Sequence, residues 1–114
     1  RTRKYKYILN LAHQLPYPIS IYSIEAPTWK MLLNQDSPML GERTLEAYRH
    51  RPRHELFDLQ TDSLELHNLA ECSEHAELLK NLQNKLRQWR EKTQDPWLES
   101  YEEDRPIKIN FALN

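Results

Sequence analysis

The segment "RHELFDLQTDSLELHNLAE", residues 53–71, constrains the fold of this chain more than any other. It begins with an alternating run, in which Leu56 lies on one side of an extended chain and Phe57 and Leu59 lie on the other. Apolar groups on both sides favour an interior strand that is covered on both faces. An acidic turn follows at once, and the segment contains no glycine to loosen it. We therefore predict a rigid corner after this strand.

The acidic turn has the residue pattern of a helix start. Asp62 is predicted to accept a hydrogen bond from the backbone N–H of Glu65, and the Glu65 carboxylate is predicted to reach back to Asp62. This is the arrangement of a capping box, with aspartate in the place that Ser or Thr usually takes. The pattern predicts a capped helical turn inside the corner.

The first part of the chain reads as a strand followed by a loop. Residues 1–11, "RTRKYKYILNL", have high β-propensity and place Tyr5, Tyr7 and Leu9 on one side, which predicts a strand with one better-buried face. Pro16 and Pro18 then exclude both a helix and a central strand. Residues 13–23 are therefore predicted to form an ordered extended loop.

Shorter elements follow before the corner. Pro27 suits the first position of a helix, so residues 27–34 are predicted to be helical. Residues 35–42, which contain Gly41, are typical of a loop. Residues 43–50, "RTLEAYRH", are predicted to add one or two helical turns that end before Pro52.

The strongest helical pattern runs from Ser73, a suitable N-cap residue, to about Thr93. Its apolar side chains fall at steps of three and four and form one stripe: Leu79, Leu82, Leu86 and Trp89. This stripe is expected to pack on the sheet of the same domain, and a partner-binding surface is the alternative. After Pro96 and an acidic patch, residues 107–114, "IKINFALN", are predicted to form a last strand.

Size and composition favour one folded domain of 114 residues. The single glycine excludes the glycine-rich loops that cradle phosphates. Residues 1–54 carry nine Lys and Arg against four Asp and Glu, whereas residues 55–114 carry seven against thirteen. The basic half suits a polyanion, although two faces that complement each other in the folded chain explain the asymmetry as well.

Other kinds of site find little support in the sequence. His50 and His54 have the spacing of zinc ligands on a helix, but Pro52 between them breaks that helix, so no metal site is expected. Cys72 lies among glutamates that disfavour a reactive thiolate, which indicates a structural cysteine. The basic clusters "RTRKYK" and "RHRPRH" suit single-stranded nucleic acid, yet no nucleic-acid motif accompanies them, and no such partner is expected. No apolar run is long enough to span a membrane.

The corner, together with "RTRKYKYILNL" before it and "LLKNLQNKLRQW" after it, resembles the C-terminal subdomain of the type I sulfatases over nearly the whole chain. The residues at the positions of the family's pattern are Asp58, Asp62, Glu65, Asn68 and Leu69, with Ser63 in the usual place of a proline. Within the family, "LPYPIS", "APTWKMLLN", "RPRHELFD" and "KTQDPW" resemble the heparan N-sulfatases, or sulfamidases.

This resemblance implies an α+β fold, in which an antiparallel sheet of about four strands carries one long amphipathic helix packed on it. Residues 1–114 are then a single C-terminal subdomain cut from a longer enzyme. The resemblance implies that the family's catalytic domain, with its calcium ion and a formylglycine made in a C/S-x-P-S-R type motif, lies elsewhere. No such motif occurs here, since Cys72 begins C-S-E-H. We expect no catalytic residue, no metal ligand and no sulfatase turnover in this piece alone.

The resemblance also implies partners and a place of action. The implied partners are the catalytic domain of the same enzyme and a sulfated glycan, and a homodimer is compatible with the resemblance. The expected location is extracytoplasmic: periplasmic, secreted or lysosomal. Because the substrate is an anion, Arg51, Arg53 and His54 are the candidates for lining the mouth of its pocket. The alternative for each is a solvated residue or an interdomain salt bridge. The alternative for the chain is an independent anion-binding, glycan-binding or protein-interaction module without activity.

Overall fold

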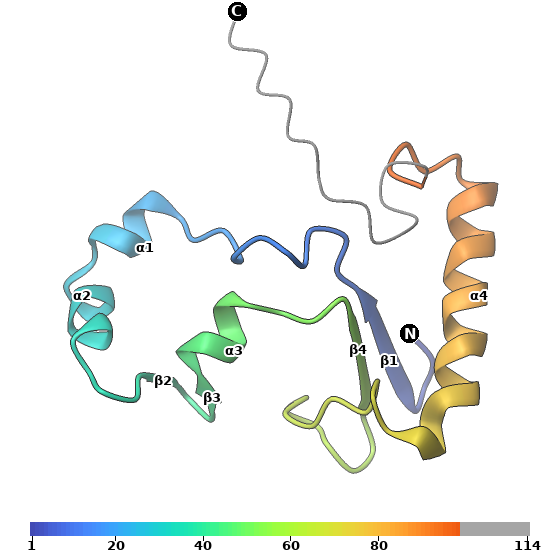
Figure 1. Cartoon of the computed structure of the whole chain (residues 1–114), viewed down its shortest axis with the longest axis horizontal. Coiled ribbons are helices and arrows are strands. Elements are labelled where there is room, and N and C mark those ends of the chain that lie inside the picture. The colour runs from blue at the N-terminus through green and yellow to red at the C-terminus, as the bar shows by residue number, and fades with distance from the viewer. Residues whose placement is uncertain (99–114) are drawn as a thin grey trace, which may run out of the picture. The chain divides into compact units, whose positions relative to one another are not determined.

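The computed structural model describes residues 1–98, and the chain divides into two compact units, Arg1–Leu69 and Ala70–Asn114. Figure 1 shows the order of the elements along the chain. The first unit holds every strand of the described part and three short helices, and the second holds the long helix. Each unit is described below by itself.

Strands β1 (Tyr5–Leu9) and β4 (His54–Asp58) form an antiparallel pair in which Tyr7 faces Leu56. Two backbone hydrogen bonds extend this ladder beyond the strand ends: the Leu59 N–H donates to the Lys4 carbonyl at 2.7 Å, and the Asn10 N–H donates to the Arg53 carbonyl at 2.8 Å. The two strands predicted at these places are thus confirmed. The better-buried face predicted for β1 is not found, because all five residues of β1 are half-buried.

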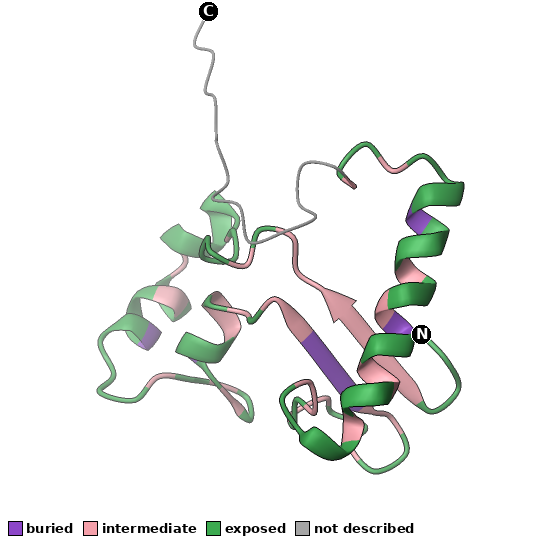
Figure 2. Cartoon of the chain, turned by 45° about the vertical axis from the view of Figure 1, so that its right-hand side comes forward, coloured by how far each residue is buried: buried purple, intermediate pink, exposed green. Residues whose placement is uncertain are grey.

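The centre of β4 is the best-buried part of the first unit (Figure 2). Leu56 is fully buried, Phe57 is 3% exposed, and Glu55 is 8% exposed. Burial of neighbouring residues that point to opposite faces confirms that β4 is covered on both faces. β4 nevertheless has only β1 as a strand neighbour among residues 1–98, so it is not an interior strand of the described sheet.

The edge of β4 that faces away from β1 is closed by the corner rather than by a strand. The Leu56 N–H donates to Oδ1 of Asn68 at 2.9 Å, and the Leu56 carbonyl accepts from the Leu69 N–H at 2.8 Å. Nδ2 of Asn68 donates to the His54 carbonyl at 3.0 Å. Residues 68 and 69 therefore satisfy the buried backbone of β4 as a neighbouring strand would.

A small hairpin precedes the corner, in residues for which the sequence indicates only a loop and a helix. β2 (Met39–Leu40) pairs with β3 (Arg43–Thr44), and Gly41 at the turn has φ +64°. A positive φ is the reason for glycine here, because an added Cβ would meet no atom within 4 Å. Helix α3 (Leu45–Arg49) follows, capped by the Thr44 hydroxyl, which accepts the Ala47 N–H.

Helix α2 (Pro27–Leu33) confirms the predicted helix, with the proline in its first turn. Just before it, α1 (Ile21–Glu25) begins inside the segment 13–23 predicted to be an extended loop. The prolines at 16 and 18 exclude a helix only around themselves, and two residues separate the second from α1. The prediction of an extended loop is therefore wrong from Ile21 onward.

In the second unit, the 3₁₀ turn η1 (Ser73–His75) leads into α4 (Ala76–Lys92), which confirms the long helix. Ser73 is the first residue of the turn rather than the N-cap residue. The predicted stripe is wrong at its end, because Trp89 is 61% exposed and Arg90 is buried. Nε of Arg90 donates to Oδ2 of Asp95 at 2.7 Å, so the buried charge is paired.

The architecture is α+β with two small antiparallel sheets of two strands each and a C-terminal helix. The four strands do not form one sheet in the described part of the chain. The last strand predicted over residues 107–114 lies outside the described residues. The packing of the helix on a sheet, and the assignment of residues 1–114 to a single subdomain, stay predictions.

Candidate anion-binding site

The corner that leads out of β4 is built around the side chain of Asp62. Its Oδ1 accepts the Leu66 N–H at 3.0 Å, and its Oδ2 accepts the His67 N–H at 2.8 Å. These two bonds, with Leu66 the larger contribution, lower the pKa of the Asp62 carboxyl below its usual value. The predicted capping box is wrong, because the Glu65 N–H donates to the backbone carbonyl of Asp62. No helical turn begins at Asp62 either, so its carboxylate holds an irregular turn together.

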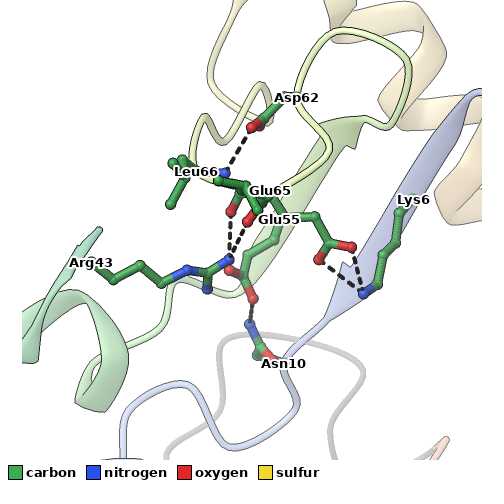
Figure 3. Close-up of polar contacts among 8 residues, drawn as sticks. Lys6, Asn10, Arg43, Glu55, Asp62, Glu65 and Leu66 are labelled. Carbon is green, nitrogen blue, oxygen red and sulfur yellow. Dashed lines mark hydrogen bonds and ion pairs between the residues drawn. The ribbon is translucent and has the colours of Figure 1, made fainter. Parts of the chain in front are cut away.

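Glu65 faces the sheet instead of Asp62 (Figure 3). Both of its carboxylate oxygens accept hydrogen bonds from Nζ of Lys6 on β1, at 3.0 and 2.9 Å. Its backbone has φ +55°, an unfavourable region for a side chain of this type. Nη2 of Arg43, from β3, donates to the Leu64 and Glu65 carbonyls at 3.1 and 2.6 Å. Contacts from two strands thus hold the strained residue in place.

Two further acidic residues of β4 take part in the same framework. Oδ1 of Asp58 accepts the Gln60 N–H at 3.0 Å and so shapes the start of the corner. The buried Glu55 accepts a hydrogen bond from Nδ2 of Asn10 at 2.8 Å, which Figure 3 shows. The five residues of the sequence pattern, Asp58, Asp62, Glu65, Asn68 and Leu69, all make hydrogen bonds within this corner or between it and the strands. Their contacts are structural.

Of the three candidate pocket residues, Arg51 lines a cavity. Its guanidinium carbon lies 4.1 Å from the centre of the Tyr17 ring and 5.5 Å from that of Tyr48. The two rings themselves meet edge to face at 5.5 Å. Beside them is a cavity of about 400 Å³ between residues 9–18 and the end of α3. The stacking fixes a positive charge at the wall of this cavity.

His54 and Arg53 are not among the residues that line this cavity. Nδ1 of His54 lies 2.8 Å from the Tyr7 hydroxyl, and the two rings are stacked with centres 6.0 Å apart. Arg53 is half-buried, and its carbonyl belongs to the β1–β4 ladder. The structure therefore does not gather the three candidates at one place, and their contact with a substrate stays a prediction.

The sequence does not predict two residues of the cavity wall, His13 and Arg49. Nδ1 of His13 and Nε of Arg49 are both buried and have no hydrogen-bond partner in the described chain. The Tyr17 N–H donates to the Arg49 carbonyl at 2.6 Å and so joins the proline-rich loop to α3. The cluster "RHRPRH" could have drawn attention to Arg49, whereas nothing local marks His13.

The described residues contain no group of three or more His, Cys, Asp or Glu side chains that could hold a metal ion. Cys72 is an exposed free thiol. Among residues 1–98, no helix has the length and apolar character needed to cross a bilayer.

Comparison with known proteins gives the relationship of the chain. No protein-family model matches it. It is 34% identical over 99 residues, 84% of its length, to the N-sulphoglucosamine sulphohydrolase of Homo sapiens, and 34% identical over 92 residues, 78% of its length, to the ulvan-active sulfatase of Formosa agariphila. The chain is a homologue of sulfatases. It spans only 20% and 15% of the lengths of these two sulfatases. The resemblance to type I sulfatases, and to a sulfamidase in particular, is thereby confirmed.

Proposed function

We propose that this chain is the C-terminal subdomain of a sulfatase that hydrolyses sulfate esters or sulfamates of glycans. The observation that carries the proposal is the 34% identity with N-sulphoglucosamine sulphohydrolase over 84% of the chain. The partner is then the catalytic domain of the same enzyme, and the enzyme works outside the cytoplasm, as a monomer or a homodimer. This location and these partners rest on the resemblance to the sulfatases.

In this proposal, the calcium ion and the formylglycine belong to the catalytic domain, where they supply charge stabilisation and the nucleophile that attacks sulfur. The described residues of this chain do not offer a cluster of ligands for a metal. Their part is to support and to bind. The corner braced by Asp62, Asn68 and Arg43 holds β4 rigid, and a rigid scaffold keeps a substrate pocket in shape. Arg51, Arg53 and His54, at the start of β4, are the residues proposed to face the anionic substrate.

The test compares three versions of the parent sulfatase. The parent sulfatase is expressed with residues 1–114 in place, with them deleted, and with the corner variant Asn68→Ala, and sulfate release from N-sulfated glucosamine and from an aryl sulfate is measured. We expect turnover with the chain in place, loss on deletion, and reduced turnover in the variant, because Asn68 holds the buried backbone of Leu56.

Two results would contradict the proposal: sulfate release by the 114-residue chain alone, or full activity of the parent after its deletion. A parent that releases sulfate from neither a sulfate ester nor a sulfamate would refute the family activity for this member.

The second candidate function is an independent module that binds anions or glycans without catalysis. The cavity lined by His13, Arg49 and Arg51 favours it, because no acidic side chain among residues 1–98 lines this cavity. A monodisperse, cooperatively folded chain whose affinity for heparin falls steeply with salt, and whose deletion leaves the parent's turnover unchanged, would support this module against the subdomain.

A further inference from the structure

The cavity beside α3 has positive charge that nothing in the described chain neutralises. Arg49 and Arg51 both line it, and none of the described residues in its wall is an aspartate or glutamate. Neither arginine has a carboxylate within 4 Å among residues 1–98. Arg87 and Arg90 on α4, by contrast, pair with Glu91 and Asp95 at 3.0 and 2.7 Å. Two unpaired guanidinium groups beside one cavity favour an anionic occupant.

Arg51 is held in the orientation that such an occupant needs. Its guanidinium carbon lies over the Tyr17 ring, and its Nε donates to the Tyr48 carbonyl at 3.4 Å. Its two terminal nitrogens make no hydrogen bond with the described residues. A guanidinium fixed by stacking presents these nitrogens as a fork that fits the oxygens of sulfate, carboxylate or phosphate, and little side-chain entropy remains to be lost on binding.

Hydrogen bonds fix the loop that lines the cavity. The Tyr17 N–H bonds the Arg49 carbonyl, and Nδ2 of Asn10 donates to the Pro52 carbonyl at 2.6 Å, so the loop is joined to α3 and to the start of β4. Buried polar atoms without partners in the described chain, Nδ1 of His13 and Nε of Arg49, belong to side chains of the cavity wall. Such atoms are costly in a folded protein and mark places where a further group completes the hydrogen bonds.

The remaining wall is apolar and the cavity is large enough for more than a bare ion. Leu9, Leu11, Leu15 and Pro16 line it, and its volume of about 400 Å³ lies in the range of small-molecule sites. We propose that this cavity binds an anionic sugar unit, with its sulfate or carboxylate on Arg49 and Arg51 and its ring against the apolar wall. The proposal deepens the proposed function and rests on it for the sugar, whereas the oxyanion follows from the cavity itself.

The experiment is a titration of the 114-residue chain followed by backbone amide NMR shifts at constant ionic strength. The probes are sodium sulfate, a monosulfated glucosamine, the same sugar without sulfate, and a uronic acid, with sodium chloride as the reference. We expect saturable shifts at residues 9–18 and 49–51 with the anionic sugars, weaker saturation with sulfate, and none with the neutral sugar. Arg51→Ala is expected to weaken binding about tenfold, the effect of one charge-assisted hydrogen bond.

Lys80→Ala is the matched control, because it removes one exposed positive charge from the second unit and is expected to leave the affinity unchanged. If Arg51→Ala loses its amide dispersion, Arg49→Gln replaces it, since that change removes the charge and keeps the backbone bond to Tyr17. The proposal would be overturned if both arginine variants bound the anionic sugar as tightly as the original chain does. It would also be overturned if shifts grew without saturation at every surface cation. Sulfated-sugar binding in a chain whose parent has no sulfatase turnover would refute the proposed function and keep the site.

Discussion

At the scale of single residues, the corner shows how polar side chains replace secondary structure. Asp62 accepts two backbone N–H groups, and Asn68 both donates to and accepts from β4. The sequence predicts a rigid corner with an acidic turn after the strand, at the place where the structure has it. It does not indicate which N–H groups the carboxylate accepts, because a capping box and this turn begin with the same residue types. The left-handed backbone of Glu65 decides between them.

Asp62 is expected to make stability depend on acid pH. A carboxyl whose pKa is lowered by folding contributes stability that is fully present above its unfolded pKa, about 4, and is lost as the pH falls through the folded value. Asp62→Asn should therefore lower the urea midpoint at pH 7 and lower it less at pH 3. Urea unfolding at the two pH values measures this, with the exposed Asp36→Asn as the control. An equal loss at both pH values would show that ionisation of Asp62 is irrelevant.

Asn68→Ala is expected to destabilise the chain by about 1–3 kcal/mol, because it leaves the N–H of the fully buried Leu56 without its acceptor. Urea unfolding followed by far-UV circular dichroism gives the difference in free energy. Asn84→Ala, at an exposed position of α4, serves for comparison and should be neutral. An Asn68→Ala chain as stable as the original would mean that another group closes the edge of β4.

At the scale of elements, periodicity predicts what is local and fails where distant residues decide. β1, β4, α2 and α4 follow from alternation, proline placement and helical spacing. Periodicity does not predict the β2–β3 hairpin, because each strand has only two residues, too few for a pattern. The stripe of α4 ends at Arg90 instead of Trp89 because Asp95, beyond the helix, pairs with the arginine. Hydropathy alone ranks these two side chains in the wrong order.

Gly41→Ala tests the hairpin. With φ +64° and open space for a Cβ, the loss comes from the backbone alone and should be about 1 kcal/mol. Gly41→Asn should cost less, because asparagine tolerates the left-handed region. Thermal and urea unfolding of both variants measure the order, and an alanine variant equal to the asparagine one would speak against a backbone origin.

At the scale of the whole molecule, the family relationship could be predicted from the corner and its flanking segments, and the comparisons confirm it. The cavity could not, because His13 and Arg49 line the same cavity only when the proline-rich loop is bonded to α3. Of the predicted pocket residues, only Arg51 lines it. The anionic-site candidate thus emerges from tertiary structure, whereas the family emerges from sequence order.

The isolated 114-residue chain is expected to release no sulfate from an aryl sulfate. Its sole cysteine is followed by Ser73, Glu74 and His75, which does not match the C/S-x-P-S-R type motif that the sulfatase resemblance requires for a formylglycine. A colorimetric assay with added calcium, run beside an intact sulfatase as the positive control, measures this. Turnover that persists in a Cys72→Ala variant would point to chemistry outside the family mechanism.

The hydrogen bonds from residues 68 and 69 to the edge of β4 also protect this edge from other copies of the protein. An exposed strand rim is a template on which extended peptides of other copies can add, and that addition starts domain swapping and fibrils. Here the rim beside Leu56 is already occupied by an amide side chain and a backbone N–H of the same chain. Loss of these bonds would therefore leave a strand edge open to other copies and favour aggregation on storage.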